Sequence, residues 1–150
     1  MRTFAVTFQG DDKFFFNISA NVGLASANIV EDVQLVQFGF FALSQQPPGM
    51  NEEELVNAAA KVVPGAIYTG APDDPLTVAI KIHQKITGGP QDGHVSVMKG
   101  NIRYDSDHLF MLVGLNNDIR AMMGSSFPRI DTHPKCPPAL AASVRRTFGG

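Results

Sequence analysis

Cysteine is nearly absent from this chain of 150 residues, and charged residues are sparse. The single cysteine, Cys136, excludes a disulfide within the chain. Charged residues make up 17% of the sequence with a formal net charge of -2, and the positive residues are scattered apart from Arg145 and Arg146. Because nucleic-acid binding usually needs a basic patch or stripe, we expect no nucleic-acid partner.

Long apolar runs are also missing from the chain. No stretch of about 18 uncharged apolar residues occurs, so we expect no membrane span. The opening "MRTFAVTFQGDD" lacks the continuous apolar region and the cleavage site of a secretory signal. The sequence therefore predicts a cytoplasmic protein, or one that is exported by a non-classical or injection-type route.

Apolar residues nevertheless make up 44% of the sequence, which is enough for the core of a single domain. Near the start, Phe4, Val6 and Phe8 alternate with small or polar residues up to the turn signal "GDD". The alternation resumes after that turn. A period of two on both sides of a Gly-Asp turn predicts a β-hairpin within residues 1–22.

Helical patterns follow in residues 23–124. The segment "DVQLVQFGFFAL", residues 32–43, is apolar nearly all round, which predicts a helix buried on most sides. Gln34, Gln37 and Gly39 depart from that character. We expect Gln37 to hydrogen-bond a loop inside the domain, and Gly39 to let a neighbouring element approach closely.

Cap residues delimit the other predicted helices. The expected N-caps are Asn51 with Glu54 in a capping box, Asp74 before Pro75, and Asp105 or Ser106. They predict an inserted helix over residues 51–63, a helix that ends at Gly88, and a helix that ends at Gly124. Between the last two, "HVSVMKGNIRY" predicts a second short hairpin. Residues 125–150 are expected to form an extended proline-held arm with one short closing helix.

Two separated stretches resemble the peptidoglycan-binding domain family of three-helix modules. They are "NVGLASANIVEDVQLVQFGF" and "TGAPDDPLTVAIKIHQKITGGPQDGHVS". In the second, the matching residues are Gly70, Thr77, Ala79, Ile80, Gln84, Asp92 and Gly93. The match is partial and spans about half of the chain. His83 replaces the phenylalanine of the family pattern, and the inserted helix, the hairpin and the arm have no counterpart.

The resemblance implies a mainly helical α+β fold, in which a peptidoglycan-binding-domain-like bundle carries an N-terminal β-hairpin and a C-terminal arm. It also implies a non-catalytic bacterial module that docks on cell-wall glycopeptide through a groove between helices. The groove residues expected from the match are Asn28, Asp32, Gly70, Asp73, Thr77, Asp92, Gly93 and His94. The alternative is a structural or accessory interaction protein that reuses the fold, such as a component of a phage-like or secretion-type injection machine. Its partner is then another protein, and an oligomer is compatible with the sequence.

Residue patterns for catalysis or metal binding are weak in this chain. His83, Asp92 and His94 could be read as a zinc site, but no dense cluster of ligands is present. Cys136 and His133 lie in "THPKCPP", a rigid segment without oxyanion donors. The pairs of acidic residues are explained by helix capping. We therefore expect no enzyme activity, no metal and no cofactor.

Overall fold

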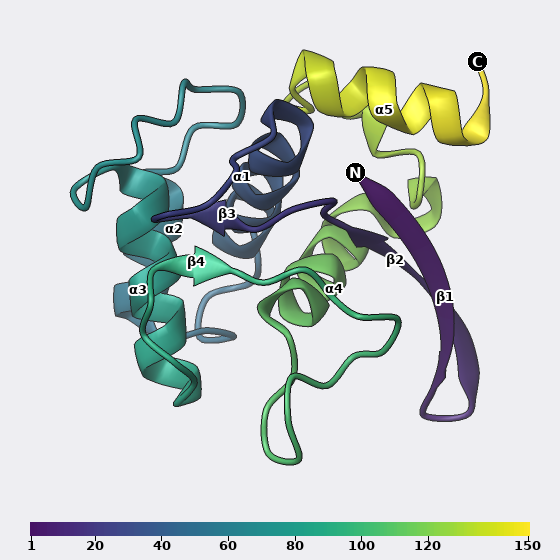
Figure 1. Cartoon of the computed structure of the whole chain (residues 1–150). Helices are drawn as coiled ribbons and strands as arrows, with labels where there is room; N and C mark the ends of the chain where they lie inside the picture. The colour runs from purple at the N-terminus through teal and green to yellow at the C-terminus, as the bar shows by residue number, and fades with distance from the viewer.

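The computed structural model describes residues 1–150, except for the side chain of Phe8. The fold is mixed α+β and mainly helical, as the sequence predicts (Figure 1). Its helices are α1 (Val30–Ser44), α2 (Glu53–Ala60), α3 (Pro75–Thr87), α4 (Met111–Met123) and α5 (Pro138–Phe148). Its strands are β1 (Arg2–Phe8), β2 (Asp11–Asn17), β3 (Val22–Gly23) and β4 (His94–Val95). Within the described residues, no helix has both the length and the apolar character that crossing a membrane requires.

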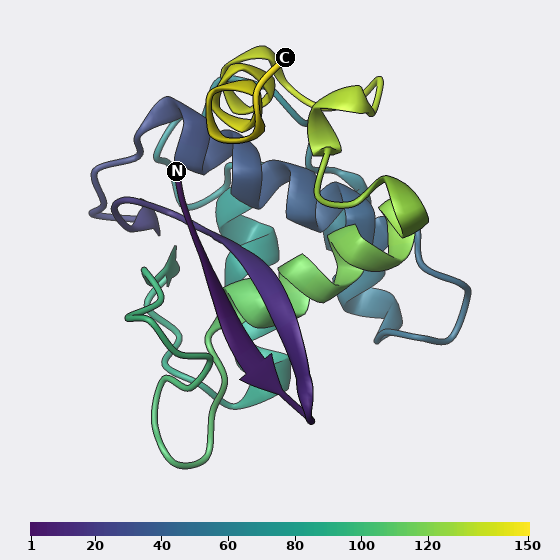
Figure 2. The same ribbon diagram turned by 90° about the vertical axis from the view of Figure 1, so that its right-hand side faces the viewer.

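The predicted N-terminal hairpin is formed by β1 and β2, which pair antiparallel. Gln9 and Gly10 make the two-residue turn, with φ angles of 53° and 83° that are typical of tight turns. The turn comes earlier than the predicted "GDD", because Asp11 and Asp12 already pair with Phe8 and Thr7 in the strands. Phe15 and Phe16 are both 0% exposed, so both faces of β2 are covered where one was expected. Figure 2 shows the hairpin lying across α4. The sequence also predicts which face of the hairpin Phe8 occupies, but its side chain lies outside the described part of the structure.

The centre of the core is α1, which packs against α4, α2 and α5. Its residues from Asp32 to Phe40 are all buried, as the apolar pattern predicts. The helices α1 and α4 approach closely at Gly39, where an added Cβ atom would lie 2.9 Å from Cβ of Leu115. The expected role of this glycine is thereby confirmed. The helix begins at Val30, two residues before the predicted start.

The predicted caps are correct for α3 and wrong for α2 and α4. Asp74 accepts a hydrogen bond from the backbone N–H of Leu76 at 2.9 Å, and Gly88 ends α3 with a φ of 77°. By contrast, α2 begins after Glu52, without any side-chain cap and shorter than residues 51–63. The N-cap position of α4 is Phe110, again without a side-chain cap.

The residues expected to cap α2 and α4 do not reach the helices. Asn51 and Glu54 form no capping box, because the chain enters α2 two residues after Asn51. Asp105 instead accepts hydrogen bonds from the backbone N–H groups of Asp107 and His108 and so closes its own loop. A short polar side chain that binds the nearest backbone makes a turn rather than a cap.

The second predicted hairpin is wrong. β4 pairs antiparallel with β3, far earlier in the chain, and not with the residues that follow Lys99. Residues 96–110 form a long loop that contains one bridge between Arg103 and Leu109. The pairing with β3 depends on Gly23, because an added Cβ atom would lie only 2.3 Å from the carbonyl oxygen of Gly93.

The predicted extended arm is also wrong, although its closing helix is confirmed. After α4 the chain turns through two 3-10 turns, η1 (Gly124–Ser126) and η2 (Ile130–Thr132), and returns to the core as α5. Leu140 and Val144 in α5 are 0% exposed. The backbone N–H of Leu140 also donates to Oε1 of Gln34 in α1 at 2.9 Å. The apolar side chains of this segment are therefore buried against α1, and the segment does not extend away from the domain as an open arm.

Candidate functional site

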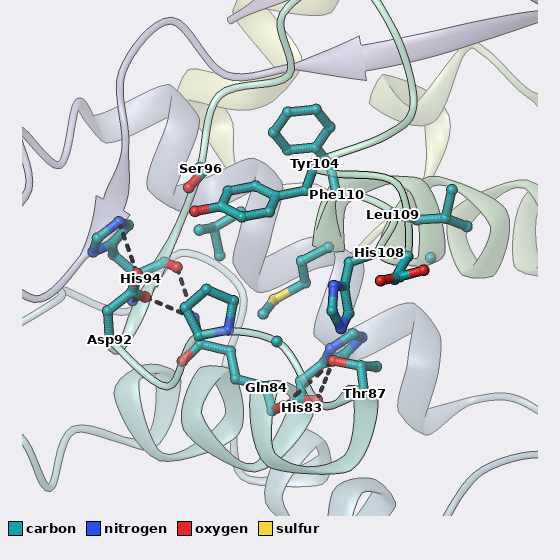
Figure 3. Close-up of a pocket in the computed structure, with 16 residues that line it drawn as sticks. His83, Gln84, Thr87, Asp92, His94, Ser96, Tyr104, His108, Leu109 and Phe110 are labelled. Atoms are coloured by element: carbon teal, nitrogen blue, oxygen red, sulfur yellow. Dashed lines mark hydrogen bonds and ion pairs between the residues drawn. The ribbon is translucent and has the colours of Figure 1, made fainter.

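A cavity of about 360 Å³ opens between the C-terminal half of α3 and the start of α4 (Figure 3). Its other walls are β4 and the loop of residues 103–110. This volume is within the range of pockets that bind small molecules. Of the four histidines in the chain, three line this cavity: His83, His94 and His108.

His108 is held in one orientation by Asp105. Its Nδ1 lies 2.9 Å and 3.1 Å from the two carboxylate oxygens. Hydrogen bonds from the backbone N–H of Asp107 and from the His108 ring hold the pKa of Asp105 below its ordinary value, so this carboxylate is negatively charged at neutral pH. A carboxylate only accepts hydrogen bonds, so it fixes the proton of the neutral ring on Nδ1 and leaves Nε2 as an acceptor. That Nε2 faces Gly88, where an added Cβ atom would be 4.0 Å away.

His83 approaches the same space from α3. Its ring packs edge-on against Phe40, with ring centroids 6.2 Å apart, and its Nε2 lies 3.9 Å from an added Cβ atom on Gly114 in α4. Its Nδ1 is buried and has no hydrogen-bond partner among the described residues. Burial lowers the pKa of His83, so its ring is neutral at neutral pH.

A hydrogen-bonded unit stiffens the wall next to β4. Nε2 of Gln84 donates to Oδ1 of Asp92 at 2.8 Å and to the carbonyl oxygen of His94 at 3.0 Å. Oε1 of Gln84 accepts from the backbone N–H of Gly93 at 3.0 Å. The turn at Gly93 has a φ of 77°, as the Asp-Gly pair predicts. This buried glutamine therefore joins the last turns of α3 to the strand that bounds the cavity.

The opposite wall is more apolar. Tyr104 is 48% exposed and packs edge-on against Phe110, with ring centroids 5.7 Å apart. Leu109, which is 45% exposed, and Pro90 also line the cavity. The site thus combines an accessible aromatic ring with imidazole nitrogens, a carboxylate and an amide.

Among the residues predicted from the family resemblance, Asp92 and His94 line this cavity, and Gly93 is buried between them in the chain. Gly70 and Asp73 are exposed on the loop before α3, at the other end of that helix. The predicted groove residues therefore do not meet in one place.

The other three predicted site residues have partners inside the fold. Asn28 accepts from the backbone N–H of Gly23 at 2.7 Å and donates to the carbonyl oxygen of the same residue at 2.9 Å. Asp32 is 0% exposed and pairs with the amino group of Met1 at 2.9 Å. Thr77, also 0% exposed, shares a hydrogen bond of 2.6 Å with the hydroxyl of Tyr68. These contacts account for the three side chains as structural groups.

Sequence reasoning missed Tyr104 and His108 as site residues. The available signal was the spacing Asp-x-x-His in "YDSDHLF", which was interpreted as a cap for the following helix. Only the start of α4 at Met111 shows that Asp105 and His108 lie in a loop that faces α3.

The other sequence hypotheses about reactive groups gain no support from the structure. Among the described residues, no three histidine, cysteine or acidic side chains converge in a metal-binding arrangement. Burial raises the pKa of Cys136 to about 12, so its thiol stays protonated at neutral pH. The ring of His133 packs against Phe38 and Phe41, and its Nδ1 accepts from the backbone N–H of Lys135. Cys136 and His133 thus do not form a nucleophile and its base.

Comparisons of the chain with protein-family models, with curated proteins and with solved structures found no match.

Proposed function

We propose that this protein is a non-catalytic binding module that docks on cell-wall glycopeptide through the cavity between α3 and α4. The observation that carries the proposal is the composition of this cavity, in which an accessible Tyr104 faces hydrogen-bonding groups of His83, Asp92 and His108. Sugar rings present apolar C–H faces and a rim of hydroxyl groups. A half-exposed aromatic ring suits the faces, and side chains with a nearby donor and acceptor suit the hydroxyls.

The residues behind the family resemblance add support to this proposal. Gln84, Asp92 and Gly93 match the family pattern by their spacing, and they form one hydrogen-bonded unit, of which Gln84 and Asp92 line the cavity. These contacts explain why the three matched residues occur at these positions, next to the proposed binding cavity. The replacement of the family phenylalanine by His83 adds a polar group to the same cavity.

A pull-down on purified cell-wall sacculi tests the proposed function. We expect the full chain to be retained at moderate salt and to be released by soluble muropeptide. Tyr104→Ala removes the accessible ring and should abolish retention, whereas Ile67→Ala, which changes a side chain that is 91% exposed outside the cavity, should leave it intact. Both variants are first checked for unchanged thermal unfolding. Absence of wild-type retention, or equal retention of both variants, would contradict the proposal.

A second candidate function is a structural or accessory protein that binds another protein, as in an injection machine. Large apolar side chains on the surface favour it: Ile67 is 91% exposed, Met50 is 68% exposed, and Val30 and Val63 are each 62% exposed. The hairpin adds a two-stranded sheet, whose outer edges could pair with a further strand. Light scattering on the purified chain separates the two functions, because a strict monomer that binds sacculi counts against the second.

A further inference from the structure

Two imidazole rings line the cavity from opposite walls. His83 extends from α3 toward Gly114 in α4, and His108 extends from the loop before α4 toward Gly88 at the end of α3. Figure 3 shows the two rings pointing toward one another. Within the described part of the chain, no hydrogen bond is formed by the Nε2 atom of either ring, whereas Nδ1 of His108 is bonded to Asp105.

The two rings present opposite hydrogen-bonding characters at Nε2. In the neutral form of His108, the Asp105 carboxylate holds the ring proton on Nδ1, so that Nε2 is an acceptor. Nδ1 of His83 is buried without a partner. We assign the proton of the neutral His83 ring to Nε2, where it faces the cavity as a donor, because an N–H group at the buried Nδ1 would have no partner. The cavity therefore holds a donor and an acceptor that face each other.

We infer that His83 and His108 form a subsite for one hydroxyl group of a sugar ring, and that the cavity binds the glycan part of the cell wall and not its stem peptide. The hydroxyl oxygen accepts from Nε2–H of His83, and its proton is donated to Nε2 of His108. This inference rests on the proposed function and deepens it. Tyr104, half exposed in the opposite wall, then packs against the face of the same ring.

Hydrogen-bonding chemistry selects a hydroxyl over the charged groups of a peptide. An ammonium group has only donors and would meet the N–H of His83, whereas a carboxylate has only acceptors and would meet the lone pair of His108. A carboxylate is further disfavoured by the negative charge of Asp92 and Asp107, which line the cavity. A hydroxyl carries a donor and an acceptor on one oxygen atom and so satisfies both rings at once.

Nuclear magnetic resonance of the ¹⁵N-labelled full chain tests the subsite, because imidazole nitrogen shifts report the tautomer and the hydrogen bonds of each ring. In the free protein we expect the proton on Nδ1 of His108 and on Nε2 of His83. Addition of the trisaccharide chitotriose should shift both rings, while His133, which lies outside the cavity, stays unchanged and serves as the internal control. The free stem tetrapeptide should leave the two rings unshifted.

A pair of variants makes the test specific to the Nε2 atom of His108. His108→Asn keeps an amide near the position of Nδ1, where it can still bond Asp105, but removes the acceptor at Nε2, and we expect about a tenfold loss of affinity for chitotriose. His108→Gln places an amide oxygen closer to the position of Nε2 and should restore part of the affinity. His133→Gln should leave it unchanged. Each of the three variants is first checked for a thermal unfolding midpoint equal to that of the wild type.

The outcomes distinguish failure of the subsite from failure of the proposed function. Wild-type retention on sacculi with unaltered chitotriose affinity of His108→Asn overturns the subsite and leaves the binding module in place. Shifts of His83 and His108 by the tetrapeptide, or stoichiometric binding of ZnCl₂ at these rings, also overturn it. Specific chitotriose binding without retention on sacculi supports the subsite and contradicts docking on the cell wall.

Discussion

At the scale of single residues, the polar side chains of α1 explain how a helix so rich in apolar residues folds into one defined place. Gln34 bonds the backbone of α5, and Asp32 accepts from the backbone N–H groups of Ser19 and Ala20. Gln37 likewise hydrogen-bonds the backbone of the loop after α2. A buried polar group is tolerated when its hydrogen bonds are satisfied. Each of these side chains therefore ties one neighbouring segment to α1.

Gln37→Leu tests this role directly. Gln37 is 3% exposed, its Nε2 donates to the carbonyl oxygen of Ala66 at 2.9 Å, and its Oε1 accepts from the backbone N–H of Gly65 at 2.9 Å. Leucine leaves both backbone groups without this partner, so we expect the free energy of unfolding to fall by about 1–2 kcal/mol and the melting temperature to fall with it. Thermal unfolding measures the change. Gln45→Leu, at the exposed end of α1, is the control, and equal melting temperatures for the two variants would refute the role.

At the scale of elements, close packing of α1 on α4 decides where the hairpin and the cavity lie. The same helix α4 holds β2 through Asn116, whose Oδ1 accepts from the backbone N–H of Phe16 at 2.8 Å and whose Nδ2 donates to its carbonyl oxygen at 2.9 Å. At its start, α4 bounds the cavity next to His108. A shift of α4 relative to α1 would therefore displace both the hairpin and the cavity wall.

Two glycines on these helices give a matched pair of variants for this contact. Gly39→Ala would place a Cβ atom 2.9 Å from Cβ of Leu115, and we expect it to lower the free energy of unfolding by about 1–3 kcal/mol because the helices must separate. Gly114→Ala meets only Nε2 of His83 at 3.9 Å, an ordinary contact, and should stabilise the chain by up to about 1 kcal/mol through helix propensity. Denaturant unfolding compares the two. A stabilising Gly39→Ala would contradict the close approach.

At the scale of the whole molecule, the pH dependence of folding includes a partly buried carboxyl group, that of Asp118, which opposes folding. Burial raises the pKa of Asp118 to about 6. The charged form is therefore disfavoured in the folded chain, and this cost is present above the folded pKa. The cost declines as pH falls through about 6 and is gone below the ordinary pKa of about 4, where Asp118 is protonated in both states.

Asp118→Asn should remove this cost. We expect the variant to gain about 1–2 kcal/mol in free energy of unfolding at about pH 7.5, because it places no charge in the folded protein there. This range is smaller than the pKa shift alone implies, because solvent screens a group that is partly exposed. The gain should shrink toward zero at about pH 4. Denaturant unfolding at several pH values measures it, with the exposed Asp73→Asn as control. A gain of the same size at every pH would show that titration of Asp118 is not its cause.

Prediction succeeded where neighbouring residues decide the outcome and failed where distant ones do. The helix α3 starts at Asp74 and Pro75 and ends at Gly88, as predicted, since a cap and its helix lie within a few residues of each other. Asn51 and Asp105 have the same residue types as good caps, yet the chain starts α2 and α4 further on. A cap residue is only a competitor for nearby backbone groups, and packing decides which groups it finds.

The sequence by itself determined the local elements of this protein: the N-terminal hairpin, the buried character of α1, and the loop-binding role of Gln37. The first two follow from residue periodicity, and the third follows from the need of a buried amide side chain for hydrogen-bond partners within the protein. Only the tertiary structure decided that β4 pairs with β3, that α5 returns to α1, and that His83 and His108 line one cavity (Figure 3). Such meetings join residues far apart in the chain, and their free energy comes from packing that no local pattern encodes.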